Sequence, residues 1–227
     1  MKTNKTAILV FANSAEKELK LKSIQSASVF KLLNSEVLKT VKKTGLPYFH
    51  FSENEQTGTN FGKRFSNAIQ AIYNKGFDTV ISVGNDTPHL KAAHILKAKN
   101  QLNYSDCVLG PSTDGGFYLM GLKKTHFNKA QFETLPWQNS KLQHVLKTGL
   151  KTEKQHVFYL EPLTDLDTVS DINTILNSFK ALVFKLKALL ISLIKIDKHC
   201  LTLHQNLQNN SYFKLHNNKG SPFLRFI

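Results

Sequence analysis

The sequence predicts an α/β fold, a mostly parallel sheet with helices on both faces and a helical extension at the C-terminal end. Short continuous apolar runs such as "TAILVFA" (6–12) are typical of strands buried on both faces. Segments with apolar residues at helical spacing separate these runs, which is the pattern of parallel strands joined by helices. With 227 residues, 41% of them hydrophobic, the chain is long enough to bury a sizeable core.

The expected elements alternate along the first hundred residues. After the strand at 6–12, we expect strands at 46–52 and 78–84 and helices at 27–45, 60–76 and 88–102. Thr87 is the expected N-cap of the third helix, with Pro88 at its first position. The pattern then changes: 106–112 and 115–122 are close enough to pair antiparallel or as a mixed-sheet insertion, and 155–161 supplies a later strand.

The chain divides into an α/β domain (1–178), an amphipathic helical extension (179–208) and a loose tail (209–227). From residue 171 to 208 apolar residues recur every three or four positions, which predicts one long helix with a seam formed by Leu182, Leu186, Leu189, Leu193, Ile196, Cys200, Leu203 and Leu207. The seam is expected to pack on the chain's own domain or on a second copy in a homo-oligomer. Alternatively, lysines outside the seam favour a basic helix on an anionic membrane surface.

The net charge of +14 indicates polyanionic partners, such as nucleic acid, an anionic membrane or phosphorylated substrates. Among 30 basic residues, however, the only arginines are Arg64 and Arg225. Base-edge readout favours arginine, so we expect no specific nucleic-acid binding.

The two cysteines, Cys107 and Cys200, lack metal-ligand spacing, which favours a reducing compartment. The apolar run near the N-terminus stops at Asn13 and is interpreted as a strand rather than a signal peptide. No run reaches the roughly 18 apolar residues that a membrane span needs. A cytoplasmic protein, peripheral to the membrane if the extension binds lipid, is therefore expected.

Asp86 in "ISVGNDTPHL" is the first candidate for chemistry. It follows a buried strand at the edge where open parallel sheets bind ligands. A carboxylate there suits a hard divalent cation, and Mg²⁺ typically takes one or two carboxylates plus substrate phosphates. Helix capping by Asp86 is the competing interpretation, but Thr87 already occupies the expected cap position.

A second acidic ligand is expected among Asp114, Asp165 and Asp167. Alternate residues of an extended segment point the same way, so Asp165 and Asp167 are expected to line one site. Asp171 has capping-box spacing to Thr168, and we expect it in the first turn of a helix instead.

Asp114 lies in "VLGPSTDGGFYLMG" (108–121), two apolar runs joined by a turn sequence. The Asp-Gly-Gly run is a usual hairpin signal, so Asp114 has a structural interpretation. Alternatively, the turn presents Asp114 to a ligand, with Gly115 and Gly116 opening space beside it.

Four blocks in order, "GNDTPHL", "VLGPSTDGGFYLMGL", "LPWQNSKLQ" and "LTDLDTVSDI", resemble those of a bacterial family of uncharacterised glycosyltransferase-A-like proteins. That family looks like a relative of the phospholactate and molybdenum-cofactor guanylyltransferases. The resemblance covers most of 6–180 and implies a Rossmann-like, nucleotide-diphospho-sugar transferase-like fold. It also implies a divalent metal, Mg²⁺ or Mn²⁺, on the diphosphate of a nucleotide or nucleotide sugar.

The resemblance assigns expected roles to particular residues. Asp86 resembles the metal-binding carboxylate, with Asp165 or Asp167 as the second, and Asp114 lies in the donor or acceptor pocket with a catalytic role. The residues expected on the substrate side are Gly62, Arg64, Asn85, Thr87, Gly115, Gly116 and Trp137. Arg64 also has a simpler interpretation as a surface ion pair, and Trp137 as a core residue.

The segment after the first strand departs from the family pattern. Nucleotidyl-transferring relatives have a loop there with glycine, arginine and lysine, whereas "FANSAEKELKLKS" offers only Lys17, Lys20 and Lys22. We therefore expect a metal-dependent transferase that uses a nucleoside-diphosphate sugar. The alternatives are a nucleotidyltransferase that releases pyrophosphate and a non-catalytic binding protein with a degenerate site.

Overall fold

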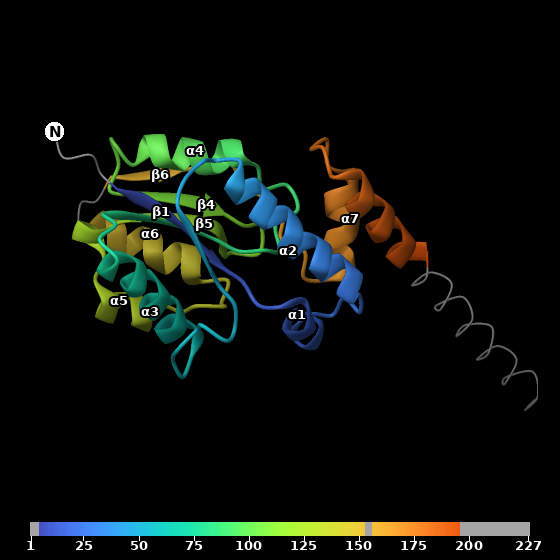
Figure 1. Ribbon diagram of the computed structural model, residues 1–227, viewed down its shortest axis with the longest axis horizontal. Helices are drawn as coiled ribbons and strands as arrows, with labels where there is room; N and C mark the ends of the chain where they lie inside the picture. Colours follow the sequence, from blue (N-terminus) through green and yellow to red (C-terminus); the bar gives the residue numbers. More distant parts are fainter. Residues whose placement is uncertain (1–4, 153–155, 196–227) are drawn as a thin grey trace, which may run out of the picture.

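The protein is built on one mixed sheet with helices on both faces, as a computed structural model describing residues 5–152 and 156–195 shows (Figure 1). Within those residues the sheet has six strands in the order β2-β1-β3-β5-β4-β6. Their bounds are Thr6–Phe11 (β1), Tyr48–Phe51 (β2), Thr79–Val83 (β3), Cys107–Pro111 (β4), Phe117–Lys123 (β5) and Val157–Tyr159 (β6). The predicted α/β class is confirmed.

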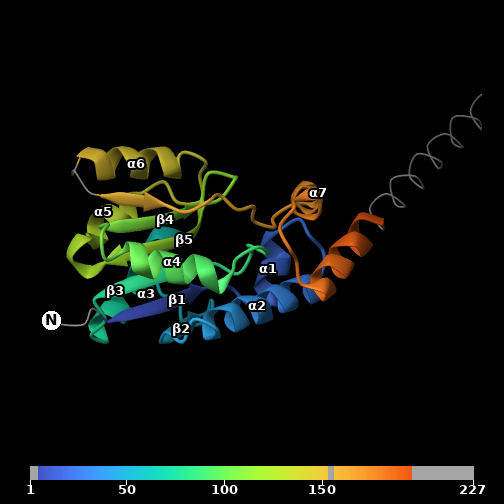
Figure 2. The ribbon, with the colours of Figure 1, turned by 90° about the horizontal axis from the view of Figure 1, so that it is seen from above.

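The helices form two layers over the sheet and a group at its end (Figures 1 and 2). They are α1 (Ala15–Leu21), α2 (Ala27–Lys42), α3 (Phe61–Asn74), α4 (Ala92–Gln101), α5 (Lys129–Thr134), α6 (Leu142–Thr152), α7 (Val169–Asn177), a 3-10 turn at Lys124–His126 and a helix at 184–195. One face of the sheet packs on α2 and α4, and the other on α3, α5 and α6. β1 and β3 have buried interiors, as their uninterrupted apolar sequences predict.

β5 is the antiparallel strand of the sheet. It pairs antiparallel with both β3 and β4, whereas β1–β2, β1–β3 and β4–β6 are parallel pairs. The hairpin of β4 and β5 is therefore inserted as a unit, one of the two alternatives that its short connection predicts. Its turn is carried to the same edge of the sheet as the carboxyl end of β3.

The predicted start of α4 is wrong. The helix begins at Ala92 with Lys91 as N-cap, and the backbone N–H of Lys91 donates to His94 Nδ1 at 3.1 Å. Thr87 caps nothing, because its hydroxyl donates to Asp165 Oδ1 at 2.5 Å. Residues 87–90 form a turn instead, in which the Leu90 N–H donates to the Thr87 carbonyl at 3.1 Å.

A single long helix from residue 171 onward is also wrong. α7 ends at Asn177, the chain is non-helical through residue 183, and a second helix occupies 184–195. The Ser178 hydroxyl donates to the Ile175 carbonyl at 2.9 Å and closes the first helix. The second helix buries Leu186 and Leu190 in a core shared with α1, α2 and α7. The rest of the expected extension and the tail lie outside the described residues.

None of the helices in the described ranges has the length and apolar character needed to cross a membrane.

Packing of the 184–195 helix can be tested with two neighbouring leucine-sized residues. Leu190 is 0% exposed and Ile191 is 37% exposed. We expect Leu190→Ala to lower the free energy of unfolding by about 2–5 kcal/mol, because it leaves a cavity in the shared core. Ile191→Ala should cost less than about 1 kcal/mol. Urea unfolding followed by circular dichroism measures both, and equal costs would show that the helix does not pack as described.

Candidate functional site

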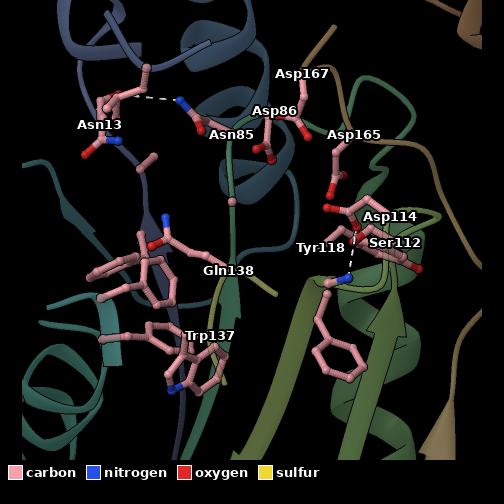
Figure 3. A pocket seen from close by; sticks show the side chains of 18 of the residues that line it. Asn13, Asn85, Asp86, Ser112, Asp114, Tyr118, Trp137, Gln138, Asp165 and Asp167 are labelled. Atoms are coloured by element: carbon pink, nitrogen blue, oxygen red, sulfur yellow. Dashed lines mark hydrogen bonds between the residues drawn. The ribbon is translucent and has the colours of Figure 1, made fainter. Parts of the chain in front are cut away.

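A cavity of about 1020 Å³ opens at the carboxyl ends of β1 and β3, beside the β4–β5 turn. This is the edge at which the alternation of strands and helices predicts a ligand site. Four aspartates line it, Asp86, Asp114, Asp165 and Asp167, together with two glutamates, Glu18 and Glu53. Figure 3 shows the aspartate side chains directed toward one another, with aromatic side chains including Trp137 on the opposite wall. The structure thus brings all four acidic candidates to one cavity.

The position of Asp86 is set by the end of β3. All five residues of that strand are buried, and Asp86 follows it by three positions. The Asp86 carbonyl accepts a hydrogen bond from the Leu166 N–H at 2.8 Å. Because Leu166 is fully buried, this bond places Asp165 and Asp167 beside Asp86. Asn85 is turned away to Asn34, to which its side-chain amide donates at 2.5 Å.

Lys22 is the site residue whose role the sequence did not reveal. Its ammonium lies 2.7 Å from both Asp86 Oδ2 and Asp167 Oδ1, and 3.7 Å from Glu18 Oε2. It also donates to the Leu166 carbonyl at 3.3 Å. Burial lowers the pKa of Lys22, but attraction to Asp86 and Asp167 outweighs burial and holds the pKa above its usual range. Lys22 is therefore the counter-ion of two of the four aspartates, Asp86 and Asp167.

Asp165 takes part in none of the ion pairs between the residues that the structure describes. Burial, followed by repulsion from Asp86 and then Asp114, raises the pKa of Asp165 to about 8, although hydroxyls of Thr87 and Ser112 partly stabilise the charged form. Asp167 differs, because its pKa is raised by burial but drawn back by Lys22. Asp165 and Asp167 line one cavity, as the sequence predicts. They differ in that Asp167 is paired with Lys22 and Asp165 is not.

Asp114 both forms the β4–β5 turn and faces the cavity. Its Oδ1 accepts hydrogen bonds from Ser112 Oγ at 2.6 Å and from the Gly116 N–H at 2.9 Å. Gly115 has φ +98°, and a Cβ there would lie 2.7 Å from the carbonyl oxygen of Ser140. The two interpretations of this turn are therefore compatible. The Asp114 side chain stabilises the conformation of the turn, and the turn directs that side chain into the cavity.

The remaining substrate-side candidates fall into two groups. Arg64, Asn85, Gly116 and Trp137 line the cavity, whereas Gly62, Thr87 and Gly115 are not among its lining residues. Thr87 acts through its bond to Asp165, and Gly115 through the packing of its turn. Gly62 is buried in α3, where a Cβ would lie 2.8 Å from both Trp137 Cδ1 and the Glu133 carbonyl.

Arg64 and Trp137 have different surroundings. Arg64 is half-buried, and among the ion pairs of residues 5–152 and 156–195 it takes part in none, so the surface ion pair is not found. Trp137 packs on Phe61, Phe65 and Phe132, and its Nε1–H donates to the Phe132 carbonyl at 2.7 Å. Trp137 is thus both a core residue and part of the cavity wall.

The acidic site fits a divalent cation held jointly with a substrate, but not a cation enclosed by protein. Within the described parts of the chain, no three Asp, Glu, His or Cys side chains are arranged around one metal position. Two carboxylates are sufficient for Mg²⁺ when substrate oxygens complete the shell. The pKa of Asp165 is raised first by burial and then by neighbouring carboxylates, so this carboxyl is a group that a bound cation would ionise.

Comparisons with known proteins agree with this architecture. Residues 35–139 match a family described as "Uncharacterized protein conserved in bacteria (DUF2064)". A crystal structure from Desulfovibrio desulfuricans G20, provisionally assigned as a nucleotide-diphospho-sugar transferase, is 21% identical, with a TM-score of 0.72 over 85% of this chain and 98% of that chain. The predicted nucleotide-diphospho-sugar transferase-like fold is thereby confirmed.

A more distant structure is Rv0371C from Mycobacterium tuberculosis H37Rv in complex with manganese. It is 14% identical, with a TM-score of 0.46 over 77% of this chain and 99% of that chain. No protein of curated function is significantly similar to the chain in sequence.

The raised pKa of Asp165 predicts a pH-dependent stability. Between about pH 4, the usual pKa of an aspartate, and about pH 8, the folded protein keeps a proton that the unfolded chain has lost. The free energy of unfolding should therefore fall as pH rises through this window, and the fall should be smaller in Asp165→Asn. Urea unfolding at several pH values in a chelator measures the slope, with Glu36→Gln, which removes a half-buried carboxylate of α2 outside the cavity, as control. Parallel slopes in all three proteins would contradict the prediction.

Proposed function

We propose that the protein is a metal-dependent transferase that uses a nucleoside-diphosphate sugar. The observation that carries the proposal is the convergence of four aspartates on one large cavity at the carboxyl edge of the sheet. A diphosphate is bound at such an edge through a cation shared with carboxylates. The confirmed fold is consistent with this chemistry.

Asp86 and Asp165 are the proposed metal ligands. As the second ligand beside Asp86, Asp165 is preferred to Asp167, because Lys22 lies 2.7 Å from Asp167 Oδ1, whereas Asp165 takes part in none of the ion pairs between described residues. Asp86 shares one oxygen, Oδ2, with Lys22, and its other oxygen is not part of that ion pair. When bound, Mg²⁺ or Mn²⁺ would supply positive charge against the leaving diphosphate.

The opposite wall of the cavity suits the nucleoside. Phe11, Phe61 and Trp137 line it, and stacking on aromatic faces is available to any nucleobase. Arg64 lines the same cavity and presents a guanidinium, the side chain best matched to phosphate oxygens. We assign the base to the aromatic wall and the diphosphate to the space between Arg64 and Asp86.

Asp114 is the proposed catalytic residue. Its Oδ1 is engaged by Ser112 and Gly116, whereas no described hydrogen bond involves Oδ2. A carboxylate oxygen in this position can accept the proton of an acceptor hydroxyl as the glycosidic bond to the diphosphate breaks. Ser112 and Gly116 hold the carboxylate in place.

Nucleotidyl transfer is the second candidate and is less well supported. It requires a loop after the first strand whose backbone amides grip a triphosphate. Here the Ser14 N–H donates to Glu53 Oε2 at 2.6 Å, and the Ser14 hydroxyl donates to Glu53 Oε1 at 2.5 Å. A carboxylate thus occupies a position where phosphate would be required.

A non-catalytic binding protein is the third candidate. The observation that favours it is Lys22, since an ammonium between Asp86 and Asp167 can stabilise this acidic cluster without a metal. Binding and turnover experiments distinguish it from the enzymes.

Metal-dependent nucleotide binding tests the proposal first. Isothermal titration is carried out with UDP-, GDP- and ADP-sugars and with nucleoside triphosphates, with and without Mg²⁺ or Mn²⁺. We expect one of the nucleotide sugars to bind, and to bind only when the metal is present. Asp86→Asn should weaken that binding by at least about 10-fold, because a metal ligand is lost. Glu36→Gln, which removes one carboxylate outside the cavity, should bind normally. Preference for a triphosphate would favour nucleotidyl transfer, and no binding at all would refute both enzymes.

The role of Asp114 is tested by a variant that keeps its turn. In Asp114→Asn the side-chain oxygen still accepts from the Gly116 N–H, but the general base is lost. We expect donor binding within about twofold of the parent and a transfer rate lower by about 10²- to 10⁴-fold. Donor hydrolysis or transfer to an acceptor panel gives the rate. An unchanged rate would restrict Asp114 to its structural role.

A further inference from the structure

The 184–195 helix has a second apolar stripe on the side that faces away from the domain. Its inward side buries Leu186 and Leu190. On the other side Phe184, Ala188 and Ile191 are exposed at a spacing of four and three residues, which places them on one face. Phe184 is 86% exposed, and Phe179 in the preceding connection is fully exposed. We call Phe179, Phe184, Ala188 and Ile191 the outer apolar surface.

This surface lies at the end of the molecule remote from the sheet. Figure 2 shows the 184–195 helix, in orange to red, beyond α7 and on the far side of α1 and α2 from the strands. Two exposed phenylalanines within six residues are unusual for a surface without a binding role. A ligand here would leave the cavity free.

Lysines flank the outer apolar surface on both sides. In a helix of 3.6 residues per turn, Lys185 and Lys187 fall on opposite sides of the stripe from Phe184 to Ile191. Lys195 lies at the C-terminal end of the same stripe. From residue 172 to 195 the sequence has four lysines and no acidic residue. Lys180 pairs with Glu161 at 3.3 Å, whereas the other three take part in none of the ion pairs between described residues.

We propose that the outer apolar surface and its flanking lysines bind the surface of an anionic phospholipid bilayer. Helices that lie in the membrane interface have this arrangement, with apolar residues on one side and lysines beside them. The aliphatic stems of lysine contact the apolar boundary while their ammonium groups reach the phosphates. A second copy of the chain is a poorer partner, because both copies carry a net charge of +14. This inference does not depend on the proposed transferase chemistry.

The full-length protein can be tested by flotation with vesicles. We expect it to bind vesicles of phosphatidylcholine mixed with phosphatidylglycerol, to bind phosphatidylcholine alone much more weakly, and to dissociate as salt is raised. Phe179→Ser with Phe184→Ser should lower the partition coefficient by about 100-fold. Both side chains are exposed, so the fold should be retained, which circular dichroism verifies. Tyr104→Ser is the matched control, since Tyr104 is an exposed aromatic residue outside this surface.

A second pair of variants tests the charge separately. Lys185→Gln with Lys187→Gln should lower binding to anionic vesicles by about 30-fold, while Lys42→Gln with Lys43→Gln at the end of α2 should change it little. Equal binding by the parent and by both surface variants would overturn the proposal. So would sedimentation showing a dimer that the phenylalanine variant abolishes while vesicle binding is unchanged.

Discussion

The backbone hydrogen bond from Leu166 to the Asp86 carbonyl joins two segments that are 80 residues apart, and the acidic site depends on it. Leu166 is buried, so its neighbours Asp165 and Asp167 must face the cavity. The nearby bridge between Ser112 and Leu163 attaches the same segment to the β4–β5 turn. A strand end, a turn and a connection thereby contribute carboxylates to one place.

The charges of this site are balanced unevenly. Lys22 lies 2.7 Å from one oxygen of Asp86 and from one oxygen of Asp167, whereas among the described residues Asp165 takes part in no ion pair and keeps a raised pKa. Asp86 and Asp167 are therefore stabilised by a cation of the protein, and Asp165 is not. This difference between Asp165 and Asp167 is the physical basis for choosing Asp165 as the second metal ligand beside Asp86.

The helices at the end of the sheet connect the cavity to the outer surface of the molecule. α1, the first half of α2, α7 and the 184–195 helix share one apolar core. Lys22 follows α1 directly, and Thr168, the N-cap of α7, lines the cavity. The outer apolar surface is thus built on the same packed unit that positions Lys22.

The sequence by itself determined the class of fold, the alternation of strands and helices at 27–102, and the acidic candidates, because periodicity and strand ends are local properties; the short helices α1, α5 and α6 were not predicted. It also predicted the Thr168–Asp171 capping box, which the structure confirms. Only the tertiary structure decided that Thr87 binds Asp165 rather than capping α4, and that the C-terminal helix breaks after Asn177. The same holds for Lys22, since nothing near it in the sequence indicates the carboxylates of residues 86 and 167. These features depend on contacts between distant segments, whose energies outweigh local preferences for capping and helix continuation.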